Sequence, residues 1–296
     1  MGLFFNKESK ENKTKVPPKG KVISLLNQKG GVGKTTMAFN VAHALSREGK
    51  KVLCLDMDPQ ANLSLLCSGG VSFKSDKNIF HLLLNSVREL KALHTPVVFT
   101  EVVVRDEKID LLPSGDELSG FELSVAGISS PRQLILKRFL EKSNLLNFYD
   151  YIIIDGPPTL GLLVVNILCA TDGLLVPFRP DEFSRRGLGH LYNVLDNIED
   201  MGITKIPTIV AHIPNLVDNR RKQESADLEK IVADLEEKFG EPKMVDPFYN
   251  RASLVKSQAE KKSVFEFKGK EFNRLQDQFQ HIAGLIETWR QEGPRL

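Results

Sequence analysis

Apolar and polar residues alternate along the chain in two kinds of block. Short, almost wholly apolar runs indicate strands that are buried on both faces of a parallel sheet. They fall at residues 21–27, 51–56, 108–114, 149–155, 173–178 and 208–214. Between them, the spacing of apolar residues is typical of helices, most clearly at residues 34–48, 78–92, 130–142, 183–199 and 221–238. This alternation predicts a doubly wound α/β fold, with a mostly parallel sheet flanked by helices.

The two ends of the chain differ from this pattern. Residues 1–20 are rich in Lys, Glu and Asn, which predicts a flexible tail before a single domain spanning residues 21–296. The last predicted helix, residues 271–291, carries a stripe of apolar residues. Such a stripe packs on its own domain, binds a partner or lies on a membrane. We favour packing on its own domain, because Glu271, Asp277 and Glu287 suit an anionic lipid surface poorly.

Composition narrows the class of protein. The 296 residues are 41% hydrophobic and 26% charged with a net charge of +2, so a basic patch must be local. Three widely spaced cysteines without a CxxC pair argue against a disulfide framework or an iron–sulfur site. The most apolar stretch, residues 160–178, is interrupted by Asn166, Asp172 and Gly173, which indicates a buried helix and strand rather than a membrane span. We expect a soluble cytoplasmic protein.

A glycine-rich loop is the strongest chemical signal. The sequence "NQKGGVGKTT" at residues 27–36 follows a predicted strand and opens a predicted helix. Glycines let backbone N–H groups turn toward phosphate oxygens, a lysine neutralises the β- and γ-phosphates, and a hydroxyl binds magnesium. We therefore expect nucleotide binding by Gly30, Gly31, Val32, Gly33, Lys34, Thr35 and Thr36, with Thr35 on the magnesium ion.

Two acidic segments are predicted at the same edge of the sheet. Asp155 ends the apolar run of "YIIIDGPPTLG", and Asp56 and Asp58 follow that of "CLDMDPQAN". Carboxylates at the carboxyl ends of neighbouring parallel strands are suited to a magnesium ion and its water shell. An alternative for each residue is a strand-end or helix cap.

Together, "KGGVGKTT", "DMDPQAN" and "IIIDGPP" resemble the deviant Walker A ATPases of the ParA/MinD superfamily, over roughly residues 20–290. The sequences "NQKGGVGKTT" and "PFYNRASLVKSQAEKKSVFEF" are most similar to the ParA branch. One departure is Gly156, where ParA relatives usually have cysteine, and we expect little consequence from it.

The resemblance implies roles for single residues. Lys29 would reach across an ATP-bound homodimer to the partner's phosphates, while Lys34, Thr35 and Thr36 bind phosphates and magnesium in cis. Asp58 would position the hydrolytic water, with Asp56 and Asp155 in the magnesium shell. A bridging lysine agrees with the need for cations around a transferring phosphoryl group. Asn215, after the sixth predicted strand, is a candidate for contacting adenine or a plain turn residue.

The nucleotide-binding motifs do not indicate what ATP hydrolysis is used for, whereas a basic region near the C-terminus does. Residues 243–270 are basic, and ParA relatives bind nonspecific DNA through basic residues in this part of the chain. The candidate DNA contacts are Arg251, Lys256, Lys261, Lys262, Lys268, Arg220 and Arg221. The alternative is an ordinary solvated surface.

Three functions stay open at this point. The first is a nucleoid-associated partitioning ATPase, with DNA or protein cargo and a ParB-like or cargo adaptor protein that stimulates slow ATP hydrolysis. The second is a membrane-surface ATPase like MinD. The third is an ATP-dependent metabolic ligase of the dethiobiotin-synthetase type.

Overall fold

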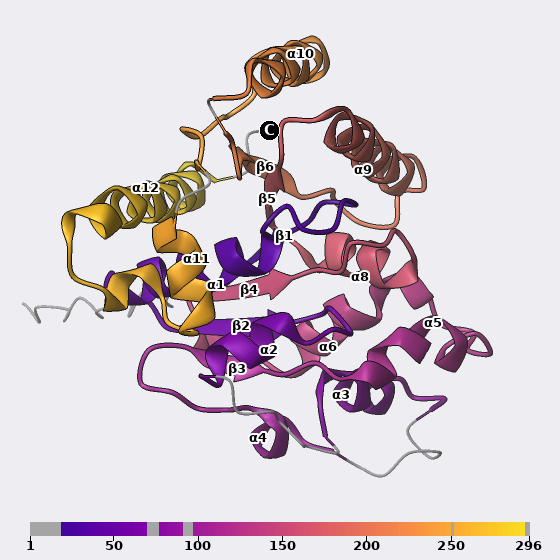
Figure 1. The fold of residues 1–296 in the computed structure, drawn as a ribbon. Coiled ribbons are helices and arrows are strands. Elements are labelled where there is room, and N and C mark those ends of the chain that lie inside the picture. Colours follow the sequence, from indigo (N-terminus) through magenta and orange to yellow (C-terminus); the bar gives the residue numbers. More distant parts are fainter. Residues whose placement is uncertain (1–18, 70–76, 91–96, 219, 250–251, 294–296) are drawn as a thin grey trace, which may run out of the picture.

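Six parallel strands form the centre of the computed structural model, which describes residues 19–69, 77–90, 97–218, 220–249 and 252–293 (Figure 1). Residues 1–18 of the predicted tail lie outside these ranges. The sheet order is β3-β2-β4-β1-β5-β6. The strands are β1 (Lys21–Leu25), β2 (Val52–Asp56), β3 (Asp110–Leu112), β4 (Tyr151–Asp155), β5 (Gly173–Phe178) and β6 (Thr208–Pro214). The predicted doubly wound α/β fold is confirmed.

Helices cover both faces of the sheet. They are α1 (Lys34–Arg47), α2 (Asn62–Cys67), α3 (Ile79–Ser86), α4 (Phe99–Val102), α5 (Phe121–Ser124), α6 (Ile135–Lys142), α7 (Leu145–Phe148), α8 (Leu162–Ala170), α9 (Glu182–Asp200), α10 (Lys222–Phe239), α11 (Ala252–Ala259) and α12 (Lys270–Glu292). Three 3₁₀ turns lie at Asp116–Gly120, Arg132–Leu134 and Val264–Glu266.

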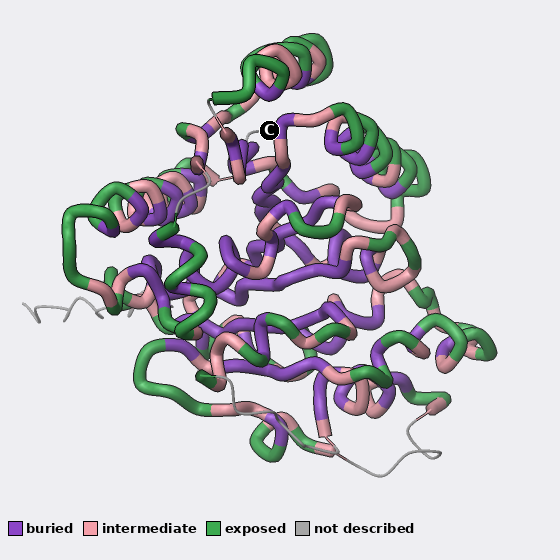
Figure 2. The backbone as a smooth tube through the Cα atoms, in the orientation of Figure 1, coloured by how far each residue is buried: buried purple, intermediate pink, exposed green. Residues whose placement is uncertain are grey.

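Successive residues of each strand enter two separate hydrophobic cores, as the pleat of a strand requires. On β1, Val22 packs with the core beneath α6, α8 and α9, whereas Ile23 and Leu25 pack with the core beneath α1 and α12. Figure 2 shows the strands buried along their length, with exposed residues on the outer sides of the helices. Burial on both faces explains why the strands are almost purely apolar in sequence.

The last helix packs on its own domain. Its apolar stripe is buried against the sheet face that also carries α1, and the stripe comprises Phe272, Leu275, Phe279, Ile282, Ile286 and Trp289. Within the described ranges, none of the helices has both the length and the apolar character that crossing a bilayer would need.

Two predicted helices differ from the structure at their ends. The helix expected at 78–92 stops at Ser86, whose hydroxyl donates a hydrogen bond to the Leu83 carbonyl at 2.7 Å and competes with the helical pattern. The helix expected at 130–142 starts only at Ile135. Buried Asn166 accepts a hydrogen bond from the Leu136 N–H at 3.1 Å and donates one to the Arg132 carbonyl at 2.8 Å, which fixes the 3₁₀ turn before it.

Candidate nucleotide site

The glycine-rich loop joins the end of β1 to the start of α1. Gly31 and Gly33 have φ angles of 71° and 91°, in the left-handed region that favours glycine. A Cβ at Gly33 would lie 2.2 Å from Nδ2 of Asn215, which donates a 2.8 Å hydrogen bond to the Val32 carbonyl. The loop is therefore held closely against the residue that follows β6, and only glycine fits at position 33.

Lys34 and Asp155 lie close enough for their charges to interact. The Lys34 side chain is buried, and its Nζ donates to the Lys29 carbonyl at 3.2 Å. Burial lowers the pKa of Lys34, while the carboxylates of Asp155 and Asp58 raise it in part. Asp155 is fully buried, and neither of its oxygens has a hydrogen-bond partner of normal geometry among the described residues. Burial and the neighbouring Asp56 raise the pKa of Asp155 well above its usual value.

Asp56 and Asp58 occupy different positions relative to the loop. Asp56 pairs in register with Asp155, and its carboxylate accepts hydrogen bonds from the Asp58 N–H and from both the N–H and the hydroxyl of Ser64, at 2.7 to 3.1 Å. Asp56 thereby fixes the start of α2 and the turn that carries Asp58. The Asp58 carboxylate accepts one hydrogen bond, from the Gln60 N–H at 3.0 Å, and Asp58 lines the cavity over the loop.

A cavity of about 570 Å³ lies over the loop, within the size range of ligand pockets. Gly30, Lys34, Thr35 and Thr36 form its floor. Its other walls include residues that the sequence did not single out, namely Pro158, Leu216, Leu254, Val255 and Gln258. Gln258 of α11 donates a hydrogen bond to the Thr36 hydroxyl, so the segment predicted to bind DNA also closes the nucleotide cavity.

Asn215, a candidate for contacting adenine, lies against the glycine-rich loop and lines the cavity over it. Its Nδ2 binds the Val32 carbonyl, and its Oδ1 is buried without a hydrogen-bond partner among the described residues. Asn215 therefore supports the loop backbone while lining the cavity. No sequence signal separates this role from that of a plain turn residue.

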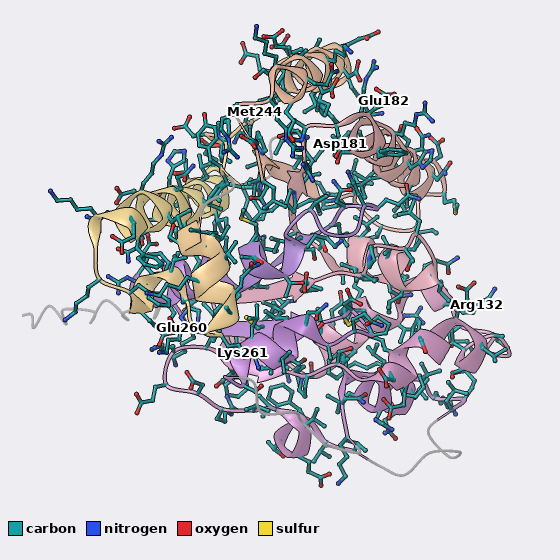
Figure 3. All side chains as sticks on the ribbon, in the orientation of Figure 1. Arg132, Asp181, Glu182, Met244, Glu260 and Lys261 are labelled. Carbon is teal, nitrogen blue, oxygen red and sulfur yellow. The ribbon has the colours of Figure 1, made fainter. Side chains whose placement is uncertain are left out.

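Gln28 and Lys29, which precede the glycines of the loop, contact α9 and do not line the cavity. The Gln28 Oε1 lies 2.7 Å from Nδ1 of His190, and the Lys29 ammonium forms an ion pair with Asp181, the N-cap of α9. Lys29 Nζ also lies 5.8 Å from the centre of the exposed Phe183 ring. Figure 3 labels Asp181 at the start of α9, and Lys261 just past the end of α11. The Lys29 side chain is thus directed away from its own phosphate loop.

The departure at Gly156 has a structural consequence. A Cβ at this position would lie 2.1 Å from Cδ2 of Leu26, so a cysteine would require the Leu26 side chain to move. Glycine at 156 and leucine at 26 are therefore packed as a pair in this chain.

The predicted DNA contacts that the structure describes lie in two regions, one before α10 and one in and after α11. Arg220 and Arg221, before α10, lie close to carboxylates: Arg220 binds Asp218 at 2.8 Å, and Arg221 lies 3.3 Å from Glu224. Lys261 lines the nucleotide cavity, and Lys262 lies 3.3 Å from Glu260. Lys256 and Lys268 are exposed near α11, which lies well apart from α10 in Figure 1. Arg251 lies outside the described residues.

Comparison with known proteins agrees with this geometry. A family model described as an AAA domain matches residues 20–207. The chromosome-partitioning ATPase Soj of Thermus thermophilus is 31% identical over 219 residues, which are 74% of this chain and 77% of that protein. The chain belongs to the ParA/Soj family of P-loop ATPases. Sporulation initiation inhibitor protein Soj of Bacillus subtilis is 37% identical over 60% of this chain and 65% of that protein.

Solved structures share the fold and contain nucleotides. The ATP complex of a Cyanothece McdA variant superposes with a TM-score of 0.75, at 22% identity over 90% of this chain and 96% of that chain. A cobyrinic acid a,c-diamide synthase of Mycobacterium smegmatis, with an ATP analogue and magnesium, has a TM-score of 0.69, at 26% identity over 93% and 97% of the two chains.

The residues of this site fit a magnesium nucleotide. Asp155 supplies a buried carboxylate close to Thr35, Thr35 lines the cavity over the loop, and the absent Cβ at Gly33 leaves room for a close-fitting loop. The described residues hold no group of three or more acidic, histidine or cysteine ligands for a metal. At nucleotide sites a magnesium ion is usually held by one or two protein oxygens, water and phosphates, and Thr35 and Asp155 would be those protein ligands.

Proposed function

We propose that this chain is a nucleotide-switched ATPase that dimerises on ATP, binds nonspecific duplex DNA in that form and positions DNA or protein cargo. Names of relatives support the general activity, since the Thermus relative is a chromosome-partitioning ATPase. The backbone of residues 30–33 and the ammonium of Lys34 hold the phosphates. Thr35 and Asp155 hold the magnesium ion, which when bound neutralises phosphate charge.

Two carboxylates near the loop have separate proposed roles. Asp58 orients the attacking water, because its carboxylate has only one hydrogen bond and lines the cavity. Asp56 already accepts three hydrogen bonds and is fully buried. We therefore assign Asp56 to holding the turn that carries Asp58, rather than to direct binding of the metal.

The position of Lys29 is the observation that carries the proposed dimer. Within the described chain, Lys34 and Lys261 are the cations that line the nucleotide cavity, and Lys29 is on the face toward α9. An ion pair with about a quarter of each side chain exposed contributes on the order of 0–1 kcal/mol, so the lysine is easily released. A second copy that offers its own Lys29 would supply the missing positive charge at the γ-phosphate.

The DNA-binding surface is proposed to centre on Lys256 and Lys268. These lysines are exposed, whereas Arg220 and Arg221 are close to Asp218 and Glu224. Cations that are already paired release fewer counterions from DNA phosphates than free ones. Lys261 and Lys262 are weaker candidates for DNA contacts, because Lys261 lines the nucleotide cavity and Lys262 lies near Glu260.

Charge reversal tests this ranking. We expect Lys256→Glu with Lys268→Glu to weaken ATP-dependent binding to random duplex DNA and to lower the slope of log K against log salt by about 2, or 0.9 for each lost phosphate contact. The matched control is Arg220→Glu with Arg221→Glu, which should have a smaller effect. The measurement is fluorescence anisotropy at several salt concentrations. A larger effect from the arginine pair would reverse the assignment.

The function itself is tested by comparing surfaces and nucleotides. The full chain is incubated with random duplex DNA or with anionic liposomes, each with ATP, with ADP and without nucleotide. The proposal predicts DNA binding that requires ATP and no binding to liposomes. ATP-dependent liposome binding would support a MinD-like function instead. Binding to neither would favour a metabolic enzyme, a class to which the name of the Mycobacterium smegmatis structure also points.

A further inference from the structure

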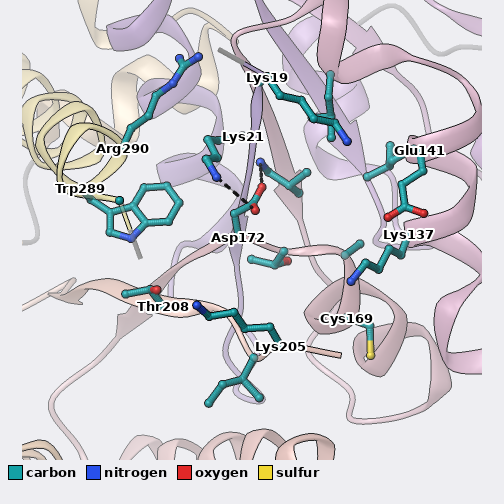
Figure 4. A pocket seen from close by; sticks show the side chains of 18 residues that line it. Lys19, Lys21, Lys137, Glu141, Cys169, Asp172, Lys205, Thr208, Trp289 and Arg290 are labelled. Atoms are coloured by element: carbon teal, nitrogen blue, oxygen red, sulfur yellow. Dashed lines mark hydrogen bonds and ion pairs between the residues drawn. The ribbon is translucent and has the colours of Figure 1, made fainter. Parts of the chain in front are cut away.

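A second cavity, of about 280 Å³, lies at the edge of the sheet opposite the phosphate loop (Figure 4). Lys21 at the start of β1, Asp172 just before β5 and Thr208 at the start of β6 line it. Because all six strands are parallel, these amino ends lie a full strand length from the nucleotide cavity. The cavity is therefore separate from the site described above, and it does not depend on the proposed function.

Positive charge dominates the walls of this cavity. Five cationic and two acidic side chains line it: Lys19, Lys21, Lys137, Lys205 and Arg290, and Glu141 and Asp172. Figure 4 shows Lys19, Lys21, Lys137 and Lys205 on different sides of the space around Asp172. A concentration of cations from separate elements in one concave site attracts anions more strongly than the same charges spread over a convex surface.

The acidic residues leave most of these cations without a carboxylate. Asp172 accepts a 2.9 Å hydrogen bond from the Val22 N–H and lies 3.6 Å from Lys21. Lys137 donates to the hydroxyl of Thr204, which carries no charge. Among the described residues, Lys19, Lys137 and Lys205 have no carboxylate within ion-pair distance. The cavity thus holds positive charge that no residue of the described chain neutralises.

Trp289 adds a hydrogen-bond donor without a partner. Its side chain lines the cavity and is only 7% exposed, and its Nε1 has no acceptor within the described residues. A buried N–H without an acceptor costs about 1–3 kcal/mol. The indole thus forms part of the cavity wall, so a change of charge inside the cavity changes the surroundings of the ring.

We propose that this cavity binds a small phosphate-class anion with several negative charges, held by Lys21, Lys137 and Lys205, with the Trp289 indole in its wall. An oxyanion with several acceptor oxygens can accept hydrogen bonds from several donors at once. It therefore suits a cavity whose lysines come from different parts of the chain. A cavity of about 280 Å³ accommodates a small anion, whereas a DNA duplex is too wide to enter it. The probe of this chemistry is pyrophosphate.

Tryptophan fluorescence reports on this cavity directly, because Trp289 is the single tryptophan of the sequence. The protein is the full chain with Lys34→Ala, because this substitution weakens phosphate binding at the loop. Pyrophosphate is titrated into it, and binding is followed by tryptophan emission and by isothermal titration calorimetry. We expect saturable binding with a change in tryptophan emission. Lys137→Ala and Lys205→Ala should each raise the Kd at least about tenfold, the value of one charge-assisted hydrogen bond.

The control is Lys230→Ala, an exposed lysine of α10 outside this cavity, which should leave the Kd unchanged. Absence of heat and of a saturable emission change would overturn the proposal. So would a Kd that is equal in the parent, Lys137→Ala and Lys205→Ala chains. If random duplex DNA displaces pyrophosphate with full efficiency, the lysines form a nucleic-acid surface and the small-anion site is also overturned.

Discussion

Replacement of Lys34 by alanine is expected to weaken ATP binding by at least about 100-fold. Burial lowers the pKa of the Lys34 ammonium, and the charges of the nearby Asp155 and Asp58 raise it in part. Hydrogen bonds to charged groups contribute about 1.5–3 kcal/mol each, and a loss of 2.8 kcal/mol corresponds to 100-fold. Without this cation, the phosphates would also face those two carboxylates with less compensation.

The measurement is equilibrium binding of a fluorescent ATP analogue with magnesium. Lys51→Ala removes an exposed lysine before β2 and serves as the matched control with unchanged affinity. Thermal unfolding of both variants establishes that they fold. Affinity within threefold of the parent for a folded Lys34→Ala chain would show that the cavity over the loop does not bind the phosphates.

Replacement of Asp58 by alanine is expected to lower ATP hydrolysis by about 100-fold or more while ATP binding and dimer formation remain. A positioned acid or base contributes typically 10²–10⁴ to a rate, and Asp58 lines the cavity with one hydrogen bond to the Gln60 N–H. The assay is release of phosphate under single-turnover conditions, with the ATP affinity measured in parallel.

Asp58→Asn separates the charge from the shape of the turn. Asparagine retains an oxygen for the Gln60 N–H but carries no negative charge, so we expect hydrolysis to fall nearly as far as in the alanine variant. If Asp58→Asn hydrolyses ATP at the rate of the parent, the carboxylate is needed for the turn and not for the water.

Much of the fold could be predicted because it follows from local pattern. Strands buried on both faces must be apolar throughout, so β1, β2 and β4 to β6 appear in the sequence nearly as they appear in the structure. The edge strand β3 is shorter than predicted, with Asp110–Leu112 against the expected 108–114, and Pro113, which has no N–H to donate, follows its last residue. Helix ends were less predictable, since Asn166 fixes the start of α6 from a distant part of the chain.

The candidate site could be predicted only where its functional residues lie together in one short segment of the sequence. The loop at residues 30–36 and the aspartates at strand ends are local signals that topology brings together. The contacts of Lys29 with Asp181, Asn215 with Val32 and Gln258 with Thr36 join residues 152 to 222 positions apart. No local pattern predicts such pairs. The sequence also does not distinguish Arg220, which is paired with Asp218 in the structure, from an exposed lysine such as Lys256.

The central claim is that Lys29 is needed for two copies of the chain to dimerise around ATP. The most direct test is the mass of the particle that the chain forms with nucleotide. Sedimentation velocity is measured with a non-hydrolysable ATP analogue and magnesium for the parent, Lys29→Ala and Asp181→Asn. Asparagine at 181 still caps α9 but removes the ion pair, so it separates a bridging role of Lys29 from a purely local one. The account predicts dimers for the parent and Asp181→Asn, and a monomer that still binds nucleotide for Lys29→Ala. An ATP-dependent dimer of Lys29→Ala with the stability of the parent dimer would contradict it.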